Sequence, residues 1–417
     1  MQPTIVEDIA IIGAGPGGLA LALALHSMGI SVTVFEQRTR DTSVGGAIIL
    51  APNALRVLDS LDVYSRLSSK GFNFDDFTFV NEQHELLNKF PFGSQSQYGF
   101  SALRIRRQVV VSELVAVAEE RGITIQFERN FSHVVEENET GVTFQFKDGL
   151  AMNASLLVGA DGIHSRVRMH LDPLVKPIYS GQLALGCVVP KSAISFPVPF
   201  SYQLPAIIYG TNGAFLFIPE DVAGEEILIG TQKSFPERDR EGWTSLSSSK
   251  EEVTELFKSN LGAWPEMVAS GVTAATKGHL TIWPYYSIPR SEKWLSEGER
   301  VVILGDAAHA IPPTGGQGAC MAFEDAFSLA LVLSCLSSKL TLQAVLKEWQ
   351  QHRLERVDNV MALTRQLGSL RLSADERAEL ARKEEMSGDY LIGDAGADLS
   401  WLYSLDLGTE VQSWFQE

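Results

Sequence analysis

The chain has 417 residues, which is enough for two or three domains of ordinary size. Hydrophobic residues make up 45% of it and charged residues 20%, which excludes collagen-like, disulfide-scaffold and intrinsically disordered classes. The 51 acidic and 34 basic residues give a formal net charge of −17, and no run of Lys and Arg offsets it. Because such a chain repels nucleic acid and anionic membranes, we expect neither as a partner.

Cysteine usage and the N-terminal residues indicate the compartment. Cys187, Cys320 and Cys335 lie far apart, without a C-x-x-C pair or a histidine at metal-ligand spacing, so we expect reduced core thiols and no metal site. The first residues do not resemble a signal peptide, and no apolar stretch approaches the about 20 residues of a membrane-spanning helix. We therefore expect a cytoplasmic protein with no membrane span.

In chain order, the first predicted unit is a strand over residues 9–12, a glycine turn over 13–18, a helix over 19–28 and a strand over 31–35. This βαβ pattern indicates a parallel sheet that is covered on both faces. Further segments follow: helices after Pro52 and over 107–121, and a β-meander over 127–158, broken at 138–141 and 148–149.

From about residue 175 to 284 the pattern changes to alternating strands, which predicts a mainly antiparallel sheet. Its predicted strands cover 183–189, 214–218 and 227–231, and we expect the polar, Ser-rich segment 236–252 to be a mobile excursion. A parallel-type strand returns at 301–304, and helices are predicted over 316–336, 342–367 and 374–386. Aromatic residues predict that the tail packs onto the body, namely Trp401, Tyr403 and Trp414.

These elements predict an α/β fold with interleaved domains. A Rossmann-like dinucleotide-binding domain, made of a parallel sheet and a β-meander, is expected from residues 1–70, 100–174 and 285–340. An inserted, mainly antiparallel sheet is expected from 71–99 and 175–284. Residues 341–417 are expected to form a C-terminal helical region.

Three glycines follow the first strand at the spacing G-x-G-x-x-G. Gly13, Gly15 and Gly18 allow a sharp turn, close approach of a pyrophosphate and tight packing of a helix on a strand, while the helix N-terminus supplies N–H donors. Glu36, at the end of the second strand, can accept hydrogen bonds from both ribose hydroxyls and would repel a 2′-phosphate. The motif therefore predicts bound FAD or NAD rather than NADP.

Two later segments also follow buried strands. Residues 159–168 read GADGIHSRVR and open a helix, and residues 305–319 read GDAAHAIPPTGGQGA. In the second, Asp306 can reach a ribityl hydroxyl, and the Pro-Pro-Thr-Gly-Gly run brings backbone close to a planar ligand. The next helix begins within 316–319, where free N–H groups can face a flavin carbonyl.

These three motifs, in this order and spacing over almost the whole chain, resemble the single-component FAD-dependent aromatic monooxygenases. That family includes para-hydroxybenzoate and salicylate hydroxylases and tetracycline-inactivating enzymes. The resemblance makes the interleaved domains an FAD-binding domain and a substrate-binding domain. It also implies the cofactor-binding residues, which are Gly13, Gly15, Gly18, Glu36, Ala47 in the 45–47 loop, Arg107, Asp161, Asp306, Gly316, Gly318 and Ala319.

The resemblance further implies that NADPH or NADH reduces FAD, and that reduced flavin captures O2 as a C4a-hydroperoxide that hydroxylates or epoxidises a small organic substrate. No second G-x-G-x-x-G is present, so nicotinamide has no Rossmann domain of its own. His309 is interpreted as structural or flavin-adjacent, and we assign no catalytic residue. A flavin reductase or oxidase of the same fold and a non-catalytic flavin-binding protein remain alternatives, and the oligomeric state is open.

The expected substrate pocket departs from that of phenol-hydroxylating relatives, which often hold a phenolate with an Arg and a Tyr on the inserted sheet. Leu185 and Ile218 occupy those positions here, and Pro313 is the third pocket residue that we predict. Such a pocket favours an aromatic or polycyclic, fairly apolar molecule of the kind found in secondary metabolism. The alternative is that Leu185 and Ile218 are ordinary core residues.

Overall fold

The structure is a computed structural model that describes residues 6–43, 45–383 and 398–416. A five-stranded parallel sheet carries the glycine motif, in the order β18-β12-β1-β2-β8. Its strands are β1 (Asp8–Ile12), β2 (Ser31–Phe35), β8 (Thr124–Gln126), β12 (Leu156–Gly159) and β18 (Val301–Ile303). Ile12 is level with Phe35 and Gly159, so the segments that follow these strands meet at one edge of the sheet.

Helices and small sheets surround this parallel sheet. Helix α1 (Pro16–Ser27) packs between α11 (Gly318–Ser334) and α5 (Arg107–Glu120), and its Ala and Leu side chains are buried. The predicted β-meander is formed by β9 (Phe131–Asn138), β10 (Gly141–Phe146) and β11 (Ala151–Ala154). A second small sheet has the order β3 (Ala47–Leu50), β7 (Ala102–Arg106) and β4 (Phe72–Phe74).

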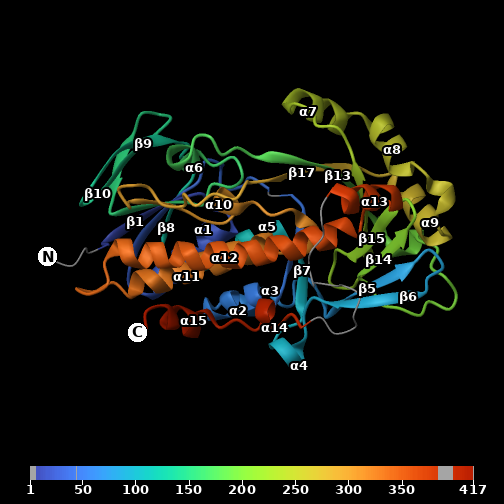
Figure 1. The fold of residues 1–417 in the computed structure, drawn as a ribbon, viewed down its shortest axis with the longest axis horizontal. Helices are drawn as coiled ribbons and strands as arrows, with labels where there is room; N and C mark the ends of the chain where they lie inside the picture. Colours follow the sequence, from blue (N-terminus) through green and yellow to red (C-terminus); the bar gives the residue numbers. More distant parts are fainter. Residues whose placement is uncertain (1–5, 44, 384–397, 417) are drawn as a thin grey trace.

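A seven-stranded mixed sheet forms the other half of the molecule, in the order β17-β13-β16-β15-β14-β5-β6 (Figure 1). Its strands are β5 (Asp76–Asn81), β6 (Leu86–Pro91), β13 (Ile178–Pro190), β14 (Ala206–Gly210), β15 (Gly213–Pro219), β16 (Glu226–Ser234) and β17 (Thr281–Ser287). All neighbours pair antiparallel except β14 and β5. Both predicted inserted segments, 71–99 and 175–284, therefore contribute to one sheet.

Three helices cover one face of this sheet, namely α7 (Arg240–Ser248), α8 (Lys250–Lys258) and α9 (Glu266–Ala275). The prediction of a mobile excursion over 236–252 is therefore wrong. Asp239 and Ser249 cap the N-termini of α7 and α8 through their side chains, and Leu246 and Val253 anchor the helices in the core. The polar composition reflects the solvent-facing side of two helices.

The C-terminal part begins with α12 (Leu342–Ser369), which runs along α11 and leads to the large sheet and α13 (Ala374–Lys383) (Figure 1). The part of the predicted helix beyond residue 383 lies outside the described residues. Helices α14 (Ser400–Tyr403) and α15 (Leu407–Trp414) pack on the body, where Tyr403 contacts Tyr98 and Trp414 stacks on His352. The predicted packing of the tail is confirmed.

The remaining short helices are α2 (Pro52–Ser60), α3 (Tyr64–Leu67), α4 (Gln95–Tyr98), α6 (Arg166–Leu171) and α10 (Asp306–His309), with 3₁₀ turns η1 (Lys191–Ala193), η2 (Leu261–Ala263) and η3 (Pro313–Gly315).

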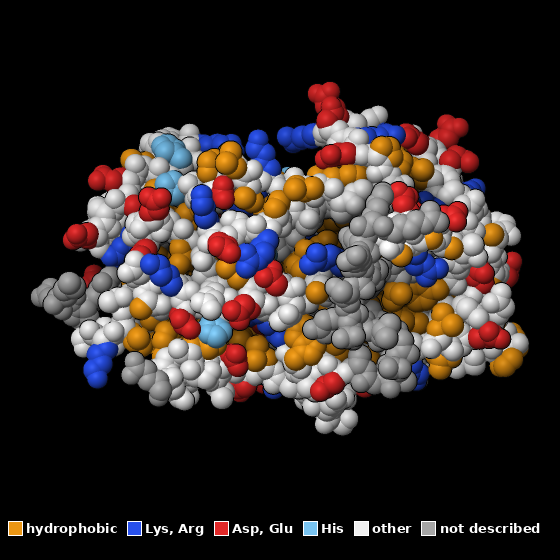
Figure 2. All heavy atoms as spheres, in the orientation of Figure 1, with side chains coloured by type: hydrophobic (Ala, Val, Ile, Leu, Met, Phe, Trp, Pro, Cys, Tyr) orange, Lys and Arg blue, Asp and Glu red, His pale blue; other side chains and the backbone are white. Residues whose placement is uncertain are grey.

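Of the helices described, none has the length and apolar character needed to cross a membrane. On the face shown in Figure 2, basic side chains lie singly among acidic ones. All three cysteines are free.

Candidate cofactor and active site

A cavity of about 620 Å³ opens at the carboxyl edge of the parallel sheet. Gly13, Gly15, Glu36, Arg107 and Asp161 all line it, although they come from four separate parts of the sequence. They are adjacent because β1, β2 and β12 end at the same edge, and because α5 begins beside it. The cavity thus brings together five of the eleven predicted cofactor-binding residues. The other six do not line it, namely Gly18, Ala47, Asp306, Gly316, Gly318 and Ala319.

The three glycines of the first motif have different surroundings. A Cβ on Gly13 would lie 2.4 Å from the carbonyl oxygen of Ala160, and a Cβ on Gly18 would lie 2.1 Å from that of Gly13. Both positions therefore require glycine for close backbone packing. A Cβ on Gly15 would meet no atom within 4 Å, so its missing side chain leaves open space in the cavity. This is the arrangement that a pyrophosphate needs at a helix N-terminus.

Glu36 lies where the second strand ends, with its carboxylate folded back over the glycine turn. Its Oε2 accepts a hydrogen bond from the Ala14 N–H and its Oε1 accepts one from the Arg38 N–H, each at 2.9 Å. A carboxylate has about four acceptor sites, so Glu36, which lines the cavity, can accept further hydrogen bonds from a ligand. The position fits the predicted contact with ribose hydroxyls.

Asp161 is a half-buried residue whose carboxylate has one partnered and one free oxygen. Its Oδ2 accepts the backbone N–H of Arg166 at 2.8 Å and so caps α6, whereas Oδ1 has no hydrogen-bond partner among the described residues. Burial raises the pKa of Asp161, and the N–H contacts act against that rise. An unpartnered oxygen in the wall of this cavity fits a ligand that brings its own hydroxyl donor.

Arg107 connects this cavity to the predicted flavin end. Its backbone N–H donates to the Gly46 carbonyl at 3.0 Å, which places the 45–47 loop beside it, and Ala47 accepts from the Arg104 side chain. Burial lowers the pKa of Arg107, and the negative charge of Asp306 acts against that fall. Asp306 is exposed to solvent, and its Oδ1 lies 4.0 Å from the position that a Cβ on Gly318 would take.

The turn before α11 presents open backbone. A Cβ on Gly318 would have only the Ile311 carbonyl and Asp306 Oδ1 within 4.0 Å, so space remains beside the first N–H groups of α11, including that of the half-buried Ala319. The predicted helix begins two residues later than expected, since Gly316 has φ +64° and closes the 3₁₀ turn over Pro313–Gly315 instead. Pro313 is exposed on this turn.

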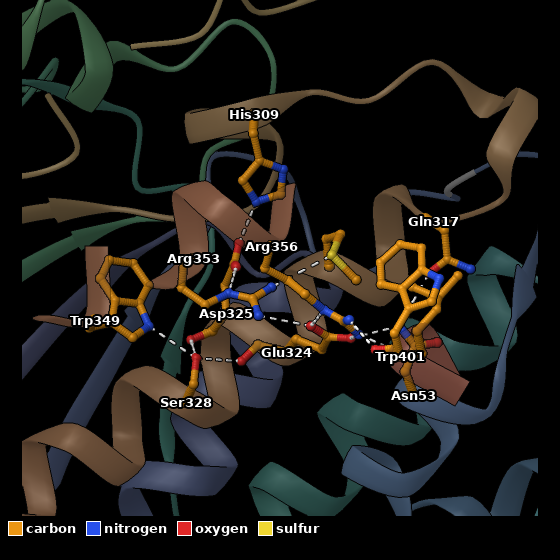
Figure 3. A network of polar contacts seen from close by, with 12 residues as sticks. Asn53, His309, Gln317, Glu324, Asp325, Ser328, Trp349, Arg353, Arg356 and Trp401 are labelled. Carbon is orange, nitrogen blue, oxygen red and sulfur yellow. Dashed lines mark hydrogen bonds and ion pairs between the residues drawn. The ribbon is translucent and has the colours of Figure 1, made fainter. Parts of the chain in front are cut away.

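A buried polar network lies behind this turn (Figure 3). Arg353 donates to Glu324 at 2.8 Å and to Asp325 at 2.7 Å, and Asn53 donates to Glu324 at 2.7 Å and to Gln317 at 3.1 Å. Charge in a low-dielectric interior is tolerated only when it is paired in this way. The network therefore fixes α11, α12 and α2 relative to Gln317, which directly precedes Gly318.

The two apolar pocket predictions fall on opposite faces of the large sheet. Leu185 belongs to the core between the sheet and α7–α9, together with Cys187 and Phe217. Ile218 and Leu216 belong to the core on the other face, which is continuous with the dinucleotide-binding half. Leu185 is thus an ordinary core residue, as the alternative interpretation held, and the structure does not bring it together with Ile218.

Several residues at the site were not predicted. Arg38, Arg129 and Arg166 line the large cavity, and Arg371 donates to the Thr314 carbonyl of the 313–315 turn at 3.0 Å. Two acidic residues within the otherwise apolar segment 318–334 could have indicated the buried network, since such charges must find partners. The cavity arginines carry no comparable signal in the sequence.

The fold and this site define an α/β dinucleotide-binding protein, and its residues fit an adenine dinucleotide. The sequence matches the family model described as FAD binding domain over residues 7–364, and the chain belongs to that family. Together with the relatives described below, this makes the chain an FAD-dependent monooxygenase of the aromatic hydroxylase type. The predicted fold class, family resemblance and FAD cofactor are thus confirmed.

Two characterised relatives extend over most of the chain. The 3-amino-4-hydroxybenzoate 2-monooxygenase of Streptomyces cremeus is 30% identical over 369 residues, covering 86% of each chain. The 6-hydroxynicotinate 3-monooxygenase of Bordetella bronchiseptica is 29% identical over 363 residues, covering 85% of this chain and 90% of the relative.

Solved structures show the same fold. CtdE in complex with FAD and a substrate aligns with a TM-score of 0.78 at 21% identity, covering 99% of this chain and 98% of the other. HpxO of Klebsiella pneumoniae, complexed with FAD and uric acid, aligns with a TM-score of 0.74 at 22% identity, covering 90% of this chain and 92% of the other.

Proposed function

We propose that this FAD-dependent monooxygenase uses NADH or NADPH and O2 to hydroxylate or epoxidise a small aromatic or polycyclic substrate of secondary metabolism, in the cytoplasm. The observation that carries the cofactor assignment is the meeting of Gly13, Gly15, Glu36, Arg107 and Asp161 in one cavity. The relatives support the aromatic substrate, because 6-hydroxynicotinate, 3-amino-4-hydroxybenzoate and 3-hydroxybenzoate stand in their names.

FAD, when bound, supplies hydride acceptance and oxygen activation, which are chemistry that protein side chains lack. The chain's own residues position it. We assign the glycine turn, Glu36 and Asp161 to the ADP half, and Ala47, Arg107, Asp306, Gly316, Gly318 and Ala319 to the flavin half. The N-terminus of α11 presents free N–H groups and the positive end of a helix dipole, which stabilise negative charge beside Gly318.

We assign segments 71–99 and 175–284 to substrate binding, with Ile218 and Pro313 as pocket residues. Aromatic side chains of the first segment lie beside the turn that carries Pro313. Phe92 lies against Gly316 and packs on Phe77 and Phe90. Phe79 stacks with Phe90 and meets Tyr209 edge-on. Such a wall excludes water and suits a planar ring.

The experiment mixes the purified flavoprotein with NADH or NADPH, with and without 3-hydroxybenzoate or 6-hydroxynicotinate, and follows flavin absorbance, oxygen uptake and product mass. The proposal expects the aromatic compound to accelerate flavin bleaching and a product that is one oxygen atom heavier. Bleaching with only hydrogen peroxide as product indicates an oxidase, and no bleaching by either nucleotide indicates a flavin-binding protein without turnover. Either result would contradict the proposed function.

A further inference from the structure

The 313–315 turn is bound to the C-terminal end of α12 through Thr314. Thr314 is buried, and its hydroxyl donates to the Thr364 carbonyl of α12 at 3.1 Å. Its own carbonyl accepts a hydrogen bond at 3.0 Å from Nη2 of Arg371, which follows α12. Thr314 is thus tied to this end of the helix through both its side chain and its backbone.

Two glycines let the turn and the helix approach each other closely. A Cβ on Gly315 would lie 2.3 Å from Thr364 Oγ1, and a Cβ on Gly368 of α12 would lie 3.3 Å from Thr314 Oγ1. Because packed interiors have little free space, a methyl group at either position would displace the turn from the helix. The turn therefore lies where α12 allows it to lie.

Helix α12 is itself fixed to both halves of the molecule. Arg353, near its middle, pairs with Glu324 and Asp325 of α11 (Figure 3). Beyond its C-terminus, the Ala374 N–H donates to the Thr211 carbonyl at 3.0 Å, in the hairpin between β14 and β15 of the large sheet. Because a continuous helix is a rigid element, α12 relates the turn to α11 and to the large sheet at the same time.

We propose that three residues at the end of α12 are positioning residues for the proposed reaction, namely Thr364, Gly368 and Arg371. They set where the turn lies between the flavin half of FAD and the substrate, since the turn carries Pro313 and leads directly to Gly316. A misplacement of about 1 Å can cost roughly a hundredfold in rate. This inference rests on the proposed function for the placement of FAD and substrate.

The test uses two variants that disturb the contact in different ways. Gly368→Ala adds a methyl group that pushes on Thr314, while the helix propensity of α12 rises. Thr314→Val keeps the shape of the side chain but removes the hydrogen bond to the Thr364 carbonyl. Both variants should retain FAD, because the residues assigned to its ADP half lie in the separate large cavity.

The FAD-loaded variants are compared with the wild type in two measurements. The first is the visible circular dichroism of bound FAD without nicotinamide, which reports the surroundings of the flavin ring and should change in both variants. The second is the yield of oxygenated 3-hydroxybenzoate or 6-hydroxynicotinate per NADH or NADPH consumed. This yield should fall roughly tenfold, with hydrogen peroxide formed in place of the product, because the reacting groups are misaligned.

Controls separate positioning from stability. Thr314→Ser keeps the hydroxyl and should retain both wild-type values. Thr273→Val removes a hydroxyl that donates to a carbonyl of the exposed side of α9, and it should change neither measurement. Wild-type dichroism and yield in Gly368→Ala and Thr314→Val would overturn the proposal, as would an equal change in Thr273→Val. Loss of FAD from both variants would also contradict it, because the turn would then be needed for cofactor binding as a whole.

The dichroism needs no turnover, so its outcome is independent of the proposed reaction. A changed spectrum in both variants of an enzyme that oxygenates neither compound would retain the positioning residues and contradict the monooxygenation of these aromatic compounds. An unchanged spectrum and yield in an enzyme that oxygenates either compound would retain the proposed reaction and contradict the positioning role.

Discussion

His309 on α10 and Asp325 on α11 form a buried pair, with Nε2 of the histidine 2.5 Å from Oδ2 of the aspartate. The same Oδ2 accepts the backbone N–H of Gly305 at 2.9 Å, and Oδ1 accepts from Arg353 at 2.7 Å. Asp325 therefore holds the turn that carries Asp306 against α11 and α12. His309 acts here as a structural partner of Asp325 rather than as a group that faces the cavity.

The first prediction concerns the stability of this pair. Asp325→Asn removes the negative charge between His309 and Arg353, and we expect it to lower the free energy of unfolding by about 3–5 kcal/mol, because it leaves a buried charge uncompensated. Urea unfolding measures the loss. Glu226→Gln, which removes one partner of the exposed Arg106 pair, is the control and should cost under about 1 kcal/mol. Equal losses in the two variants would contradict this interpretation.

The second prediction concerns acid stability. Burial raises the pKa of Asp325, but contacts with His309 and Arg353 outweigh burial and lower it to about 2, from a usual value of 3.8. A carboxylate with a lowered folded-state pKa stabilises the protein above its unfolded-state pKa, and this contribution is lost as the pH falls from 3.8 toward 2. The stability difference between wild type and Asp325→Asn should therefore shrink over this window. A constant difference would argue against the lowered pKa.

The third prediction separates two glycines of one motif. Gly18→Ala should lower the stability of the FAD-free protein by about 1–3 kcal/mol, because its Cβ would overlap the Gly13 carbonyl. Gly15→Ala should leave that stability unchanged, since open space surrounds its Cβ, but should weaken FAD binding more than roughly tenfold. Thermal unfolding and fluorescence titration with FAD measure the two effects. Full FAD affinity in Gly15→Ala would place the pyrophosphate elsewhere.

The fourth prediction concerns Glu36. Glu36→Arg should abolish FAD retention, because it replaces the acceptor for ribose hydroxyls and for the Ala14 N–H with a cation. Glu36→Gln keeps the shape and one carbonyl acceptor, so it should retain FAD with reduced affinity. The ratio of flavin to protein after purification measures both. Full flavin occupancy in Glu36→Arg would remove Glu36 from the site.

The sequence alone was sufficient for the local features of the dinucleotide-binding half. The glycine spacing, the alternation of strands and the apolar helix after Gly18 are short-range patterns, and each appears in the structure within a few residues of its predicted place. In the inserted half, the predicted excursion over 236–252 was wrong, because polar residues on the solvent side of α7 and α8 resemble a loop when the few buried anchors are overlooked.

Only the tertiary structure decided which distant residues meet. Strand order brings Glu36, Arg107 and Asp161 to one cavity, and strand pairing determines that Leu185 and Ile218 face opposite sides of the large sheet. The direction of α12 brings Arg371 next to the 313–315 turn. Sequence periodicity assigns a side chain to a face of its own element, but what packs on that face depends on contacts between segments far apart in the chain.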